Sequence, residues 1–155
     1  MDQRRTIGYK ALMAISCLVL IFLLAGQTFS LINYDITESL GLQESEEEVT
    51  LLGIAWLKAF ALGDTMSYIP LLIAGLIGLH KRKSWGFYAM FGSLAISVYW
   101  PIVNLSAVYL GKDELTLSPD KYISYSVVLP LIVLYGLWGI WYLYRHQNLV
   151  DHEKP

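Results

Sequence analysis

The stretch ALGDTMSYIPLL (residues 61–72) places one aspartate in the middle of a long apolar run. Runs of about 20 apolar residues are long enough to cross the hydrocarbon core of a bilayer as α-helices. Four such runs can be marked in the chain, at about residues 11–32, 52–79, 85–110 and 122–144. The sequence therefore predicts an all-α protein: a single integral membrane domain of four transmembrane helices, followed by a polar tail.

The composition is typical of a membrane protein. Hydrophobic residues make up 55% of the 155 residues and charged residues only 15%, whereas a soluble domain carries about 25% charged residues. The net charge is −2 and the basic residues flank the apolar runs, so nucleic-acid binding is not expected. Cys17 is the single cysteine, and the sequence lacks Cys/His spacings or glycine-rich loops typical of metal or phosphate sites. We therefore expect no metal site, no cofactor and no intramolecular disulfide.

Basic residues gather at three places: residues 4–10, residues 80–83, and Arg145 with the tail over 146–155. Lys and Arg in short loops are retained on the cytoplasmic side of a membrane. In a bundle whose helices alternate in direction, all three places lie on one side, and the loops on the other side are acidic or mixed. The sequence thus predicts cytoplasmic N- and C-termini, in a cell membrane or an endoplasmic reticulum membrane.

Polar and aromatic side chains are concentrated in the outer half of the predicted bundle, whereas the inner halves of the second and fourth helices are mostly Leu, Ile, Val and Gly. At a rise of 1.5 Å per residue, Asp64 lies roughly 18 Å into its apolar run, near the middle of a hydrocarbon core about 30 Å thick. This asymmetry predicts a cavity in the outer half. The predicted ligand-binding residues are Asp64, Asp35, Tyr68, Trp100, Asn104, Thr28 and Tyr125.

Asp64 is the predicted polar anchor of this cavity. An aspartate at the centre of a spanning helix costs about 2.5–3.5 kcal/mol to insert, so it should face the bundle interior and have partners. Tyr68 lies one helical turn further on and shares its face. One interpretation is that Asp64 binds a cation, exchanges a proton or orients a ligand. The alternative is a protonated structural aspartate whose hydrogen bonds join the second and third helices.

Prolines and glycines shape the predicted helices. Prolines at residues 70, 101 and 130 each remove a backbone donor and tend to kink a helix, which can open a cavity. Glycine pairs in the second and fourth helices let neighbouring backbones approach closely. The pairs are Gly75 with Gly78 and Gly136 with Gly139.

The stretch 55–60 (AWLKAF), followed by Asp64 and Pro70, resembles the EXPERA family, which includes the sigma-2 receptor and the emopamil-binding sterol isomerases. The prolines of the next two helices also fall at similar places. The resemblance, over about residues 30–145, implies four core helices, cytoplasmic termini and a cavity lined by acidic and aromatic residues. It also implies that Asp35 corresponds to the acid of the family's first helix.

The isomerases of that family use a histidine one turn before the acid of the second helix, and a second acid in the third helix. This chain has Phe60 at the first of these places and only Asn104 in the third helix. A double-bond shift in a sterol needs a proton donor and a proton acceptor on opposite sides of the substrate, and Asp64 alone does not provide that pair. Isomerase activity is therefore disfavoured, and we assign no catalytic residue.

The sequence favours a membrane-embedded binding protein for a hydrophobic or amphipathic small molecule, such as a sterol, an isoprenoid or another lipid, anchored by Asp64. Two alternatives stay open. The first is a small proton- or cation-coupled carrier in which Asp64 is the exchanging group. The second is a non-catalytic membrane subunit whose polar residues bind partner helices. The sequence also leaves a homodimer open.

Overall fold

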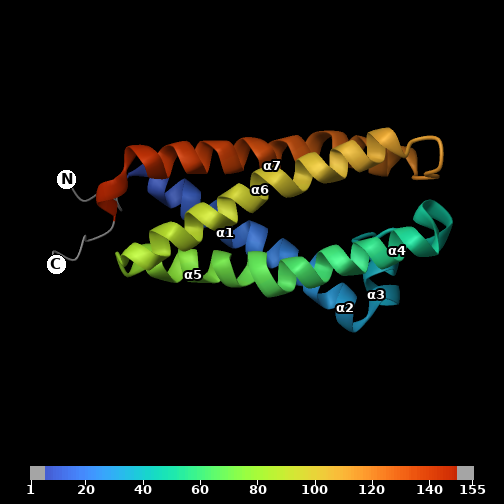
Figure 1. The fold of residues 1–155 in the computed structure, drawn as a ribbon, viewed down its shortest axis with the longest axis horizontal. Helices are drawn as coiled ribbons and strands as arrows, with labels where there is room; N and C mark the ends of the chain where they lie inside the picture. The colour runs from blue at the N-terminus through green and yellow to red at the C-terminus, as the bar shows by residue number, and fades with distance from the viewer. Residues whose placement is uncertain (1–5, 150–155) are drawn as a thin grey trace.

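The computed structural model describes residues 6–149, and this part of the chain consists of helices joined by short turns (Figure 1). Four spans are long and apolar enough to cross a membrane: Ile7–Ile32, Glu46–His80, Ser84–Leu110 and Pro119–Arg145. The prediction of an all-α protein with four membrane-length helices is confirmed. Arg4 and Arg5 of the first basic cluster, and the predicted tail from residue 150 onward, lie outside the described residues.

The first and second spans each consist of two α-helices joined by a π-helical segment. The first span contains α1 (Ile7–Leu23), η2 (Leu24–Thr28) and α2 (Phe29–Ile32), and the second contains α4 (Glu46–Gly63), η3 (Asp64–Tyr68) and α5 (Ile69–His80). The third and fourth spans are the single helices α6 (Ser84–Leu110) and α7 (Pro119–Arg145). A short helix, α3 (Tyr34–Ser39), follows the first span, and a 3-10 turn, η4 (Gln147–Leu149), follows α7.

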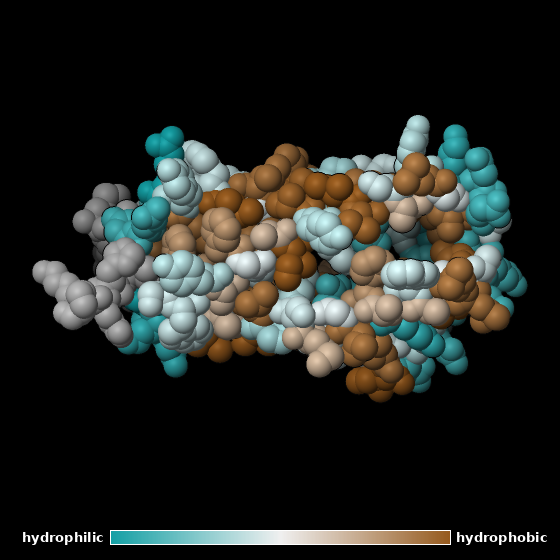
Figure 2. Space-filling model, viewed as in Figure 1, coloured by the Kyte–Doolittle hydropathy of each residue, from teal (hydrophilic) through white to brown (hydrophobic). Residues whose placement is uncertain are grey.

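The two ends of the molecule carry different charges. The first turns of α1, the turn over residues 80–83 and the last turns of α7 lie together at one end of the molecule (Figure 1). This end carries Lys10, residues 80–83 and Arg145 and is named here the basic end. The opposite end, named here the acidic end, carries the carboxylates of residues 44–48 and 113–114. Figure 2 shows hydrophilic side chains gathered toward the two ends and apolar side chains over much of the surface between them. This distribution suits a helical protein surrounded by lipid.

Close backbone contacts hold the basic-end half together. Gly78 of α5 faces Gly86 of α6, and a Cβ atom added to either glycine would overlap the backbone of the other helix. A Cβ atom added to Gly136 of α7 would lie 2.9 Å from the carbonyl oxygen of Leu94 in α6. Fully buried side chains fill the rest of this half: Leu12, Leu72, Leu79, Met90, Leu94 and Leu143.

The acidic-end half is more open. Toward this end α4 diverges from α6 and α7 (Figure 1), and Ala61 is the one buried residue among the 18 residues of α4. At the end itself, Lys121 Nζ forms an ion pair with the Glu48 carboxylate, and the Thr116 backbone N–H donates to the Glu48 carbonyl oxygen at 3.1 Å. α4 is therefore held at its two ends and loosely packed between them.

Candidate ligand-binding site

The two π-helical segments lie side by side, partway along the first and second spans. In η3, the Ile69 backbone N–H donates to the Asp64 carbonyl oxygen, five residues earlier, instead of the usual four. The side chains of Thr28 in η2 and Thr65 in η3 share a hydrogen bond, with 3.0 Å between their Oγ1 atoms. Single π-helical turns inside α-helices are frequent at functional sites. In both spans the side chains therefore change their direction around the helix axis, and they do so at the same level of the bundle.

Local sequence accounts for these segments. Pro70 follows η3 and has no N–H to donate, and a local π turn is one way in which membrane helices accommodate a proline. In η2, the Gly26 carbonyl oxygen accepts a hydrogen bond from Nε2 of the buried Gln43 at 2.8 Å. Just beyond, Ser30 Oγ donates to the Gln27 carbonyl oxygen at 2.7 Å. Carbonyl groups near the π segment are thus satisfied inside the protein, as a membrane environment demands.

Asp64 is the first residue of η3 and is buried, with 5% of its surface exposed. Its Oδ2 atom has no hydrogen-bond partner among the described residues. A buried polar group without a partner costs about 1–3 kcal/mol, and more when it is charged. The cation of the same span, Lys58, lies elsewhere, because its Nζ atom is 4.9 Å from the centroid of the Tyr34 ring. Asp64 thus has unused bonding capacity inside the protein.

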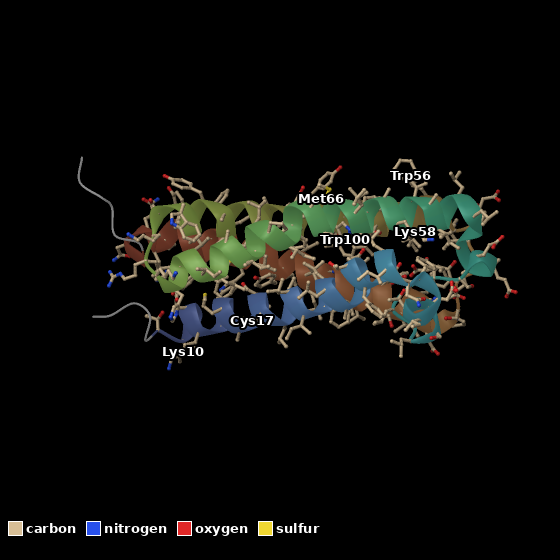
Figure 3. All side chains as sticks on the ribbon, turned by 90° about the horizontal axis from the view of Figure 1, so that it is seen from below. Lys10, Cys17, Trp56, Lys58, Met66 and Trp100 are labelled. Carbon is tan, nitrogen blue, oxygen red and sulfur yellow. The ribbon has the colours of Figure 1, made fainter. Side chains whose placement is uncertain are left out.

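Trp100 of α6 brings a second unsatisfied group to the same place. Its Nε1 atom is buried and has no hydrogen-bond partner within the described part of the chain. Trp100 and Asp64 both line one pocket of about 360 Å³, named here the deep pocket. Figure 3 shows Trp100 at mid-length of the molecule, among the helices. The deep pocket is therefore lined by two residues, Asp64 and Trp100, that each have a buried side-chain polar atom without a partner among the described residues.

The rest of the deep pocket is largely apolar. Besides Asp64 and Trp100, its lining consists of Trp56, Ala59, Phe60, Gly63, Ser67, Tyr68, Ile96 and Tyr99. The hydroxyl of Tyr68 already shares a hydrogen bond with Ser97 Oγ at 2.5 Å. Asp64 and Trp100 are consequently the lining residues whose buried polar atoms have no partner among the described residues.

A second cavity of about 270 Å³, named here the outer cavity, lies on the acidic-end side of the deep pocket. The two share Trp56, Phe60 and Trp100 in their linings, so they adjoin. α4, α6, α7 and the turn over residues 111–117 surround the outer cavity. Figure 2 shows the surface hollowed in this half, between α4 and the pair formed by α6 and α7. The two cavities are therefore neighbours, and three aromatic side chains border both of them.

The structure brings five of the seven predicted ligand-binding residues to this space. The deep pocket is lined by Asp64, Tyr68 and Trp100, and the outer cavity by Trp100, Asn104 and Tyr125. Asn104 also positions its neighbour, because its Nδ2 donates to the Trp100 carbonyl oxygen at 2.9 Å. Three spans therefore contribute predicted residues to one site.

The other two predicted residues line neither cavity. Thr28 uses its hydroxyl in the hydrogen bond to Thr65 and so joins the two π segments instead. Asp35 lies in the first turn of α3 and is exposed. The first span therefore supports the site without lining it.

The lining residues that were not predicted from the sequence include Trp56, Phe60 and Glu44. Trp56 and Phe60 precede Asp64 at intervals of four residues, which puts all three on one face of a helix. That spacing could have identified the two aromatic residues. Glu44 offered no comparable signal, because it stands beside a run of glutamates that is typical of a solvent-exposed loop.

Glu44 is nevertheless buried, with 7% of its surface exposed. Burial raises the pKa of the Glu44 carboxyl above its ordinary value, and the nearby Lys121 ammonium offsets part of that shift. The Tyr34 hydroxyl donates to the Glu44 carbonyl oxygen at 2.9 Å. Burial of the Tyr34 phenol and, to a smaller extent, the negative charge of Glu44 raise the pKa of Tyr34. These contacts fix the loop that closes the outer cavity at the acidic end.

The described residues thus define a helical protein with four membrane-length spans and two adjoining cavities, one lined by the buried Asp64 and the other by the buried Glu44. Within residues 6–149, no group of three or more His, Cys, Asp or Glu side chains could hold a metal ion. Compared with known proteins, the chain matches no family model, no curated protein and no solved structure at a significant level.

Proposed function

We propose that the protein is a membrane-embedded binding protein for a hydrophobic or amphipathic small molecule, such as a sterol, an isoprenoid or another lipid. Asp64 is its polar anchor, and the ligand occupies the deep pocket and the outer cavity. The observation that carries this proposal is that Asp64 and Trp100, whose buried atoms Oδ2 and Nε1 have no partner among the described residues, line one pocket whose other walls are largely apolar.

The energetic argument is direct. Each unsatisfied buried group costs about 1–3 kcal/mol, and a ligand that bonds to both groups removes both costs. The apolar lining then favours a ligand whose remaining surface is hydrocarbon, at about 25 cal/mol for each Å² removed from water. Ligand pockets commonly have this construction, in which a few polar groups orient the ligand within apolar walls.

The position of the site in a membrane is part of the proposal. The basic end faces the cytoplasm, because Lys and Arg in short loops are retained there, so the cavity belongs to the outer half of the bilayer. The loosely packed α4 borders a hollowed surface, and a lipid-soluble ligand reaches the cavity from the side (Figure 2). A relationship to the EXPERA family is proposed on the sequence resemblance alone.

Native mass spectrometry of protein extracted in mild detergent tests this function. The wild-type chain should carry an apolar molecule, and Asp64→Asn and Trp100→Phe should each lower its occupancy at least about tenfold. Matched controls are Asp35→Asn and Trp141→Phe, which change the same residue types at exposed positions and should retain the ligand. An empty wild-type protein, or equal occupancy in all five proteins, contradicts the proposal.

A carrier function is the second candidate, and it is favoured by the place of Asp64 in η3, at the level where the first and second spans both change direction. A carrier should produce a proton- or cation-dependent flux in proteoliposomes that disappears in Asp64→Asn. A binding protein shows no such flux. A structural subunit, the third candidate, should co-purify with another chain and keep that partner in the Asp64→Asn variant.

A further inference from the structure

We propose that the polar group of the ligand in the deep pocket is a hydroxyl, so that the ligand class is an apolar alcohol. This inference rests on the proposed function and adds the chemistry of the anchoring group. It follows from two residues that line one pocket, Asp64 and Trp100, whose unpartnered buried atoms Oδ2 and Nε1 have opposite hydrogen-bonding needs.

The two protein groups require complementary partners. An indole Nε1–H is a donor only, so Trp100 needs an acceptor. An ionised carboxylate is an acceptor only, so Asp64 needs a donor. A hydroxyl oxygen accepts one hydrogen bond and donates another, and one hydroxyl group placed between the two side chains satisfies both.

Other common head groups satisfy only one of the two. An ether, ester or ketone oxygen accepts from Trp100 but gives Asp64 no donor. An ammonium group donates to Asp64 but cannot accept from the indole N–H, which stays unsatisfied. A carboxylate repels Asp64, and no Lys, Arg or His from residues 6–149 lines either cavity to compensate its charge. The remaining walls of the deep pocket require the body of the ligand to be apolar.

Binding of three probes with one hydrocarbon skeleton tests the inference: farnesol, its methyl ether, and farnesylamine. Each is titrated against the detergent-solubilised wild-type chain at pH 7, with native mass spectrometry as the readout. Farnesol should bind roughly tenfold or more tightly than its methyl ether, because the ether leaves Asp64 without a donor. An ether or an amine that binds as tightly as the alcohol overturns the inference.

Two variants locate the hydroxyl. Asp64→Leu removes the acceptor and is compatible with an apolar helix. In this variant the affinity for farnesol should fall to that for its methyl ether, and the affinity for the ether should equal that of the wild type. In Trp100→Phe, the alcohol and the ether should weaken by a similar factor, because both oxygens accept from the indole. Retained ether binding also reports that Asp64→Leu is folded. An alcohol preference that survives Asp64→Leu unchanged contradicts the assignment.

The test separates this inference from the function on which it rests. If all three probes bind equally and Trp100→Phe weakens them, the cavity is a ligand site and only the hydroxyl assignment fails. If none of the three binds, both the hydroxyl assignment and the proposed apolar-ligand function fail.

Discussion

Thr28 Oγ1 and Thr65 Oγ1 lie 3.0 Å apart, and their hydrogen bond joins the π-helical segments η2 and η3. The bond lies where two different kinds of packing meet. Toward the basic end, glycine contacts and large buried side chains hold the helices together. Toward the acidic end, α4 diverges and the cavity begins. The two π segments therefore set the level at which the bundle opens, and Asp64 is placed at that level.

The bond between the two threonines should couple the two spans. Thr28→Val and Thr65→Val keep the side-chain shape and remove the hydroxyls. A double-mutant cycle should give a coupling energy of about 0.6 kcal/mol, with about 1.7 kcal/mol as the upper range for membrane proteins. Reversible unfolding in mixed micelles measures it. Strictly additive effects of the two substitutions would show that the hydroxyls do not interact.

Deletion of Met66 should abolish ligand binding without loss of helix content. A π turn contains one residue more than the α-helix it interrupts, so the deletion restores the α pattern and turns α4 by about 100° relative to α5. Asp64 and Trp100 then no longer line the same pocket. Circular dichroism measures the helix content, and native mass spectrometry measures the bound ligand. The matched control is Met66→Ala, which trims an exposed side chain and keeps the chain length.

The contact between α5 and α6 should be intolerant of a single methyl group. Gly86→Ala adds a Cβ atom against the backbone of Gly78 and should destabilise the protein by about 1–3 kcal/mol. In the same helix, a Cβ atom on Gly92 would lie 3.6 Å from Leu71 Cδ1, an ordinary contact, so Gly92→Ala should be neutral or slightly stabilising. Thermal unfolding in detergent compares the two. Equal destabilisation would mean that α5 and α6 do not approach closely at Gly86.

Buried Glu44 should make stability depend on pH. Because the pKa of Glu44 is raised in the folded state from an ordinary value near 4.5, the folded protein binds more protons than the unfolded chain just above that pH. The stabilising contribution is present below pH 4.5 and is lost as the pH rises through the folded-state pKa. Glu44→Gln should therefore gain stability relative to the wild type over this window.

Thermal unfolding at a series of pH values checks this dependence. Glu46→Gln is the matched control, because Glu46 is exposed and belongs to the same acidic segment. The difference in stability between Glu46→Gln and the wild type should stay constant over the pH range in which Glu44 titrates. A constant difference for Glu44→Gln as well would show that burial does not shift the titration of Glu44.

The four spans could be predicted from the sequence because bilayer thickness imposes a minimum length on each apolar run. The close backbone approach expected at Gly75, Gly78 and Gly136 is present, since only a missing Cβ atom allows it. At Gly139 an added Cβ atom would meet only the side chains of Leu94 and Leu12. The π segments were not predicted. Each is a shift of one residue in the hydrogen-bond pattern and leaves the hydropathy unchanged, although Pro70 marked the neighbourhood of one of them.

For the candidate site, the depth of each residue in the bilayer could be predicted, but the direction of its side chain around the helix axis could not. Counting residues placed Asp64, Trp100 and Thr28 in comparable parts of the bilayer, but Thr28 faces Thr65 rather than the cavity. The direction depends on the two π segments, which rotate the following residues. The burial of Glu44 could not be predicted, because it depends on tertiary contacts. Tyr34 lies across a turn from Glu44, and Lys121 is far from it in the sequence.

The most direct test is a ¹⁵N–¹H NMR spectrum of protein labelled at its tryptophan indoles, recorded in micelles before and after addition of farnesol. The Trp100 resonance is assigned from its absence in Trp100→Phe. We predict that this resonance moves downfield as its N–H gains an acceptor, while that of the exposed Trp141 stays in place. A Trp100 resonance that does not move at a farnesol concentration saturating the wild-type protein would contradict the account.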